Sequence, residues 1–213
     1  MTGVQTCALP LSDKNFVLPL DDRLPTELLT IERPQFEPRR NRYLYYPDAS
    51  PVPEGVAVNI RGKSYKIVAN TDISAQAQGV IFAHGSRFGG HVLFIKDGRL
   101  HYVYNFLGIK PEQEFISAPL TPGNRTLGVE FVRRDKGQYG ESLGTANLYV
   151  DGKLAATGPM RTQVGTFTLA GDGLCVGYDS GDNVSPQYTN PGRFTGGTIK
   201  VVAVDVSDES FID

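Results

Sequence analysis

The chain has 213 residues, 21 basic and 23 acidic side chains, and a formal net charge of −2 at pH 7. This length suits one all-β domain with its own core and is too short for two full domains. The near balance of charge excludes the single-sign field typical of nucleic-acid-binding proteins. No uninterrupted apolar run is long enough to cross a bilayer. The composition therefore predicts a soluble globular protein that partners neither nucleic acid nor membrane.

The first ten residues, MTGVQTCALP, differ in character from the rest of the chain. They resemble the in-frame translation of a sequencing-library adapter, an artefact found at the ends of assembled metagenomic fragments. The stretch is too short for a signal peptide and lacks its basic start. We therefore expect Met1–Pro10 to be foreign to the protein and the true N-terminus to be missing. Neither Cys7 nor Cys175 lies in a metal-ligand spacing.

Prolines recur throughout the next segment, Leu11–Pro53, and exclude a long helix or a central strand there. We expect this segment to be an irregular linker that runs along the surface of another body. The pattern of apolar and polar residues changes at about residue 54, and a β domain is expected from there to residue 213.

Segments of about five to nine residues in this β domain alternate apolar and polar side chains. In the clearest segment one face carries Leu100, Tyr102, Tyr104 and Phe106, and the other carries Arg99, His101, Val103 and Asn105. A period of two predicts a strand whose first face is buried, which favours a core over a sugar-stacking role for its tyrosines. Residues 127–131 and 146–150 alternate in the same way. The β-branched stretch 199–206 is predicted to be a strand buried on both faces.

Two Asp-Gly pairs separate such segments. Asp97-Gly98 lies between HVLFIK and RLHYVYNF, and Asp151-Gly152 lies between TANLYV and KLAATG. Because Asp-Gly readily adopts the positive φ angles of a two-residue hairpin, each pair predicts an antiparallel hairpin. Several short strands joined in this way predict an all-β, antiparallel two-sheet β-sandwich.

The order of these segments resembles a known fold family. A YVDG hairpin, a strand ending in VGYD and a final FTGGTIKVVAVDV strand are similar to the concanavalin A-like, laminin-G-like modules. The resemblance implies a jelly roll.

A second resemblance covers nearly all of Asn15–Asp213. NFVLPLDDR, ERPQ, RNRYLYYPD, AHGSRFGGH and the FTGGTIKVVAVDVS tail together resemble the C-terminal part of large bacterial arylsulfatases. It implies that residues 11–53 are the tail of a catalytic domain with its linker, and that residues 54–213 form a β-sandwich C-terminal to that domain. The partner would be the catalytic sulfatase domain of the same bacterial parent chain.

The chemistry of such a sulfatase needs residues that this chain does not contain. The resemblance implies formylglycine, made from a Cys/Ser-x-Pro-x-Arg signature, and calcium for the parent. Neither Cys7 nor Cys175 begins such a signature. No catalytic or cofactor-binding residue is therefore assigned, and the chain itself is expected to be inactive and to hold no cofactor.

Two weaker constellations remain. The glycines of AHGSRFGGH are surrounded by the polar residues His84, Ser86, Arg87 and His91. A catalytic triad at this place would lack its orienting carboxylate. The simpler interpretation is a polar turn whose side chains face a neighbour. Asp179, Asp182 and Asn183 form an oxygen-rich loop that is a candidate calcium site. Its spacing is not that of an EF-hand, and such loops are usually turns.

These observations leave three candidate functions. The first is a non-catalytic C-terminal domain that packs on and supports a sulfatase catalytic domain. The alternative is a lectin-like module that binds carbohydrate, and a concanavalin-class glycosidase is the third. Fold alone does not decide among them.

Overall fold

The computed structural model describes Lys14, residues 40–167 and residues 172–207; Met1–Pro10 and most of the expected linker lie outside these residues. The strands of the described residues are β1 (Arg42–Tyr45), β2 (Tyr65–Ser86), β3 (Gly89–Lys96), β4 (Arg99–Asn105), β5 (Gln113–Pro119), β6 (Gly123–Lys136), β7 (Ser142–Val150), β8 (Lys153–Thr162), β9 (Leu174–Val176) and β10 (Thr195–Val206). None of the described residues belongs to a helix long and apolar enough to span a membrane.

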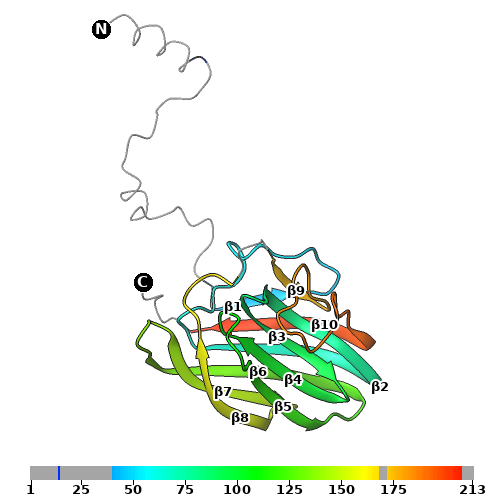
Figure 1. The fold of residues 1–213 in the computed structure, drawn as a ribbon. Coiled ribbons are helices and arrows are strands. Elements are labelled where there is room, and N and C mark those ends of the chain that lie inside the picture. Colours follow the sequence, from blue (N-terminus) through cyan, green and yellow to red (C-terminus); the bar gives the residue numbers. More distant parts are fainter. Residues whose placement is uncertain (1–13, 15–39, 168–171, 208–213) are drawn as a thin grey trace, which may run out of the picture. The chain divides into compact units, whose positions relative to one another are not determined.

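The strands form two antiparallel sheets that share β2 (Figure 1). The first sheet has the order β1-β10-β2-β6-β7-β8. In the second sheet β2 is followed by β3, β4 and β5, and β9 also pairs with β2. The antiparallel β-sandwich predicted from alternation and Asp-Gly turns is confirmed.

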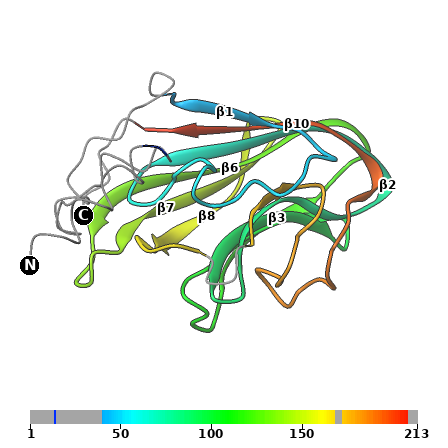
Figure 2. The same ribbon diagram turned by 90° about the horizontal axis from the view of Figure 1, so that it is seen from above.

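β2 serves both sheets because it is 22 residues long and curves between them (Figure 2). Its first part, Tyr65–Ile73, pairs with β6 and with β10. Its last part, Gly79–Ser86, pairs with β3. A register shift between Val80 and Phe82 marks a bulge just beyond the bend, and such a bulge increases the local twist of a strand.

The main core lies between the two sheets. Tyr102 and Tyr104 are fully buried in it, as the alternation predicts, together with Phe131 of β6 and Leu148 of β7. The tyrosine hydroxyls are satisfied inside the core: those of Tyr65 and Tyr102 lie 2.8 Å apart, and that of Tyr104 accepts a hydrogen bond from the Gln163 amide at 2.9 Å. These rings are therefore structural and are not available to stack on a ligand.

Both predicted hairpins are confirmed. Asp97 and Gly98 join β3 to β4 with φ angles of 50° and 67°, and Asp151 and Gly152 join β7 to β8 with 51° and 73°. Positive φ at both central positions is the geometry that matches the twist of the flanking strands.

The prediction that only one face of β4 is buried is wrong. His101, on the second face, is only 7% exposed; its ring stacks on Phe94 at 5.0 Å and its Nδ1 lies 3.0 Å from Oε1 of Glu114. The prediction for 199–206 is wrong in the opposite sense. Val202 and Val204 are buried, whereas Val201 and Ala203 on the outer face are partly exposed.

The second face of β4 is buried because residues 178–194, here called the cover segment, lie across the second sheet. Val184 and Tyr188 of this segment pack against a separate apolar cluster formed by Val80, Ala83, Val92, Phe94 and Val103. The buried Asp179 carboxylate organises the cover segment by accepting hydrogen bonds from the Val184 amide at 3.0 Å and from the Tyr188 hydroxyl. Burial raises the pKa of Asp179 to about 6.

His84 and His91 face the main core, not a neighbouring domain. Both are at most 2% exposed, and their rings lie 5.8 Å apart beside Phe167 and Tyr104. Within the described residues, none of the four ring nitrogens has a hydrogen-bond partner. Burial lowers the pKa of His84 to about 3 and lowers that of His91 well below its usual value. Both rings are therefore neutral.

The side chain of Gln113 links β5, at one edge of the second sheet, to β8, at one edge of the first. The Gln113 amide donates to the Arg161 carbonyl at 2.9 Å and accepts from the Arg161 amide at 2.7 Å. Its amide group thus pairs with the β8 backbone as a strand residue would.

Replacing Tyr104 with serine should lower the free energy of unfolding by about 2–4 kcal/mol, because the substitution removes a fully buried ring. Tyr139, which is 83% exposed in the turn between β6 and β7, provides the matched control. Tyr139→Ser should change the free energy of unfolding by no more than about 0.5 kcal/mol. Urea denaturation of both variants measures the difference, and equal losses would place Tyr104 outside the core.

The histidine pair predicts loss of stability in acid. At pH 5 the unfolded chain protonates both histidines, whereas the fold keeps them neutral. Asp179 acts in the opposite direction, because its raised pKa lets the folded protein hold a proton that the unfolded chain releases. The unfolded chain therefore binds about one proton more than the folded protein. Near pH 5 the free energy of unfolding should fall by ~1.4 kcal/mol for each unit by which the pH is lowered.

Denaturant titrations at a series of pH values between 7 and 4.5, roughly the window set by these groups, would measure this slope. His84→Leu should bring the slope close to zero, because the remaining histidine and Asp179 then offset each other. A wild-type protein that becomes more stable as the pH falls would contradict the assignment.

Candidate functional site

An open groove of about 740 Å³ lies at the loop end of the second sheet. Three segments form it: the turn between β2 and β3, the connection from β4 to β5, and the cover segment. We call it the loop-end groove. Its lining residues are Arg87, Phe88, Asn105, Leu107, Gly108, Lys110, Glu112, Gly181, Asp182, Asn183, Val184, Pro186 and Asn190.

Glycines set the shape of the β2–β3 turn that carries Arg87 and Phe88. Gly85 and Gly90 face each other across the hairpin with φ angles of 106° and 152°. A Cβ at Gly85 would lie 2.4 Å from the Gly89 carbonyl oxygen, and one at Gly90 would lie 2.4 Å from the His84 carbonyl oxygen. Only glycine fits this close approach, so the predicted glycine turn is present and presents Arg87 and Phe88 to solvent.

The buried amide of Asn105 ties the three segments together. Its Nδ2 donates to the carbonyl oxygens of Arg87 at 3.0 Å and Val184 at 2.8 Å. Its Oδ1 accepts a hydrogen bond from the Gly108 amide at 2.9 Å. Because one side chain fixes the backbone of all three segments, the groove is preformed.

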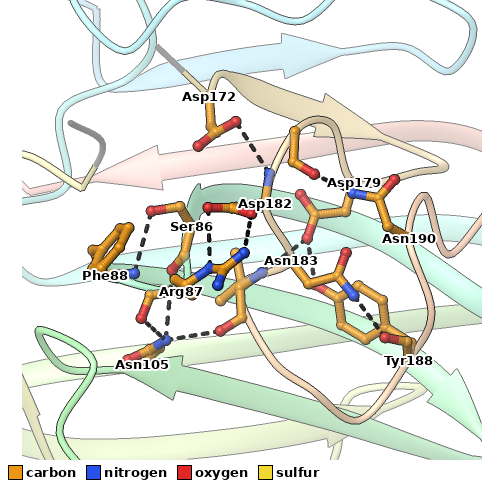
Figure 3. A network of polar contacts seen from close by, with 12 residues as sticks. Ser86, Arg87, Phe88, Asn105, Asp172, Asp179, Asp182, Asn183, Tyr188 and Asn190 are labelled. Carbon is orange, nitrogen blue, oxygen red and sulfur yellow. Dashed lines mark hydrogen bonds and ion pairs between the residues drawn. The ribbon is translucent and has the colours of Figure 1, made fainter. Parts of the chain in front are cut away.

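Two ion pairs line the groove. The Arg87 guanidinium donates two hydrogen bonds to the Asp182 carboxylate, with lengths of 2.5 and 3.1 Å (Figure 3). Lys110 Nζ lies 2.5 Å from Oε1 of Glu112, whose Oε2 accepts a hydrogen bond from the Ser185 hydroxyl at 2.7 Å. The first pair joins the β2–β3 turn to the cover segment, and Ser185 joins the second pair to the same segment.

Apolar side chains border these charges. Phe88 and Leu107, which both line the groove, are each 52% exposed. The Arg87 guanidinium carbon lies 6.0 Å from the centre of the Phe88 ring. The groove therefore combines an accessible aromatic ring with several fixed charge and amide groups, a composition common in small-ligand sites.

Of the four interaction residues predicted from the AHGSRFGGH motif, Arg87 alone is on the surface. Ser86 is 1% exposed; its Oγ donates a 3.4 Å hydrogen bond to the Phe167 carbonyl and accepts one from the Phe88 amide at 3.3 Å. His84 and His91 lie in the core. Ser86 thus shapes the turn, and the prediction that Ser86, His84 and His91 face a neighbour is wrong.

The candidate calcium loop is engaged in other contacts. Asp182 pairs with Arg87, Asp179 binds the Val184 amide and the Tyr188 hydroxyl, and Asn183 donates to the Tyr188 carbonyl at 2.6 Å (Figure 3). Among the residues that the structure describes, no group of three or more His, Cys, Asp or Glu side chains could hold a metal ion. In this structure the loop is a structural part of the groove wall.

Sequence reasoning missed Phe88, Asn105, Lys110 and Glu112 as groove residues. Asn105 carried a usable signal, since it is a single amide that directly follows the apolar run YVY. Such a residue needs hydrogen-bond partners once buried. Lys110 and Glu112 lie in a loop without a motif, and their position becomes visible only in three dimensions.

No protein-family model matches the chain, and no curated protein sequence matches it. Among solved structures, the chain is similar to domains LG4-5 of the mouse laminin alpha1 chain, with 18% identity over 79% of this chain and 40% of that chain and a TM-score of 0.43. It is also similar to CBM40 of the Ruminococcus gnavus IT-sialidase, with 15% identity over 70% and 78% and a TM-score of 0.46. A third similar structure is the Caenorhabditis elegans galectin LEC-6, with 12% identity over 79% and 96% and a TM-score of 0.38. At such low identities and TM-scores, these similarities carry no argument about function.

Proposed function

We propose that the chain is a non-catalytic module that binds carbohydrate in the loop-end groove. The observation that carries the proposal is the exposed ring of Phe88 beside charged and amide groups held by the buried Asn105. A sugar ring presents C–H groups on one face, which pack on an aromatic ring, and hydroxyls at its edge, which need hydrogen-bond partners. The groove offers both kinds of partner at once.

The size and stiffness of the groove also favour a saccharide. A volume of about 740 Å³ is within the range of small-ligand sites and accommodates more than one sugar ring. Because Asn105 already fixes the backbone of its walls, little ordering accompanies binding. The Arg87–Asp182 pair supplies charge-assisted donors and acceptors to sugar hydroxyls.

The test is a panel of oligosaccharides titrated against the protein by calorimetry. At least one should bind with a dissociation constant of roughly 1 μM to 1 mM. Phe88→Ala should weaken that binding about tenfold, equivalent to ~1.4 kcal/mol, because it removes the stacking surface. Tyr139→Ala, which removes an exposed ring outside the groove, should leave binding unchanged. Binding that survives Phe88→Ala intact, or a panel without any ligand, would contradict the proposal.

We propose as a second candidate that the chain is the domain that packs on the catalytic domain of a bacterial arylsulfatase. Leu44 and Tyr46 favour it, since both lie in the sulfatase-like segment Arg40–Asp48 and are 52% and 56% exposed. Leu44 belongs to β1, which pairs within the described residues only with β10 and so forms an edge of the first sheet. An apolar, open edge is a natural surface for a neighbouring domain.

The coding sequence upstream of Leu11 tests this second candidate. A Cys/Ser-x-Pro-x-Arg signature there would support a parent that hydrolyses sulfate esters with formylglycine and calcium. An upstream reading frame without the signature would exclude that parent and leave carbohydrate binding unaffected.

A further inference from the structure

The charges of the loop-end groove are not equally accessible. In the first pair, the Arg87 side chain is 66% exposed and that of Asp182 is 35% exposed. In the second pair, Lys110 is 59% exposed and Glu112 only 8%. In each pair the cation is therefore more exposed than the carboxylate, and an incoming ligand reaches the positive group more readily.

The two acidic residues make further contacts besides the ion pairs. Glu112 accepts the Ser185 hydroxyl through the oxygen that Lys110 does not use. The Asp182 backbone is held by its amide, which donates to Oδ1 of the largely buried Asp172 at 3.3 Å. These contacts hold the Glu112 carboxylate and the Asp182 backbone in place.

Both cations retain hydrogen-bond donors. Asp182 engages Nε and Nη2 of Arg87, and within the described residues Nη1 is left to donate to a ligand. Lys110 carries three N–H groups, of which Glu112 accepts one. Exposed ion pairs contribute little stability, so an anion that shares these donors loses little by disturbing the pairs.

From this arrangement we infer that the groove selects saccharides that carry an anionic group, a sulfate or a carboxylate, which Arg87 and Lys110 bind while the sugar ring packs on Phe88. The inference rests on the proposed carbohydrate function and adds the charge class of the ligand. Planar guanidinium donors match the oxygen pairs of both groups, and the lysine adds a compact charge.

The experiment compares one oligosaccharide backbone in neutral, carboxylated and sulfated forms, with inorganic sulfate alone as a fourth ligand. Wild-type protein should bind at least one anionic form about tenfold or more tightly than the neutral form. Inorganic sulfate should bind far more weakly than the anionic oligosaccharides, because it lacks the sugar ring. The preference should shrink as salt is raised, since the cations are exposed.

Arg87→Gln and Lys110→Gln should each weaken binding of the anionic form by a larger factor than binding of the neutral form, and so reduce the preference. Lys153→Gln removes an exposed cation at the turn between β7 and β8 and serves as the matched control, with no expected effect. Thermal melting of each variant verifies the fold. If Arg87→Gln disturbs the cover segment by removing the Arg87–Asp182 pair, Lys110→Gln still tests the anionic preference, because Lys110 pairs with Glu112 instead.

The outcomes separate the two proposals. Equal affinity for neutral and anionic forms, with both dependent on Phe88, would overturn the anionic preference and leave carbohydrate binding standing. An anionic preference that survives both glutamine variants would also overturn the inference, because the selecting cations would lie elsewhere. Absence of binding by every form would overturn the inference and the carbohydrate proposal together.

Discussion

The continuity of β2 is the constraint on which the rest of the molecule depends. One end of this strand builds the first sheet with β6 and β10, and the other end builds the second sheet with β3 and β9. The bend between them is tightly packed: a Cβ at Gly79 would lie 2.3 Å from the Arg193 carbonyl oxygen. Because the strand ends in the turn that carries Arg87 and Phe88, the pairing that shapes the core also fixes one wall of the groove.

Local sequence patterns predicted the parts of the fold that depend on neighbouring residues. Alternation placed Tyr102 and Tyr104 in the core, and the two Asp-Gly pairs located their hairpins. The same reasoning failed for the second face of β4, because the cover segment that packs with Val103 is more than seventy residues away in the chain. The cover segment has no regular period of its own, and its contacts with the apolar cluster of the second sheet come from Val184 and Tyr188. Contacts of that kind leave no periodic signal.

The site was less predictable than the fold for a related reason. The AHGSRFGGH motif marked the correct turn, yet three of its four named polar residues point inward and Arg87 alone reaches the groove. The partners of Arg87 come from other loops, and the asymmetry between exposed cations and sheltered carboxylates exists only in three dimensions. Sequence can identify a polar turn, whereas the sign of the charge that a ligand meets depends on packing.

The Gln113 contact has a consequence for how copies of this protein behave toward one another. Terminal strands of open sheets can template pairing with other chains, and this drives aggregation. The Gln113 amide occupies the backbone N–H and C=O of Arg161, the groups through which β8 would otherwise recruit another chain at that position. The contact therefore acts as a local safeguard against aggregation on the β5–β8 side, whereas β1, at the opposite margin, pairs with β10 alone among the described strands.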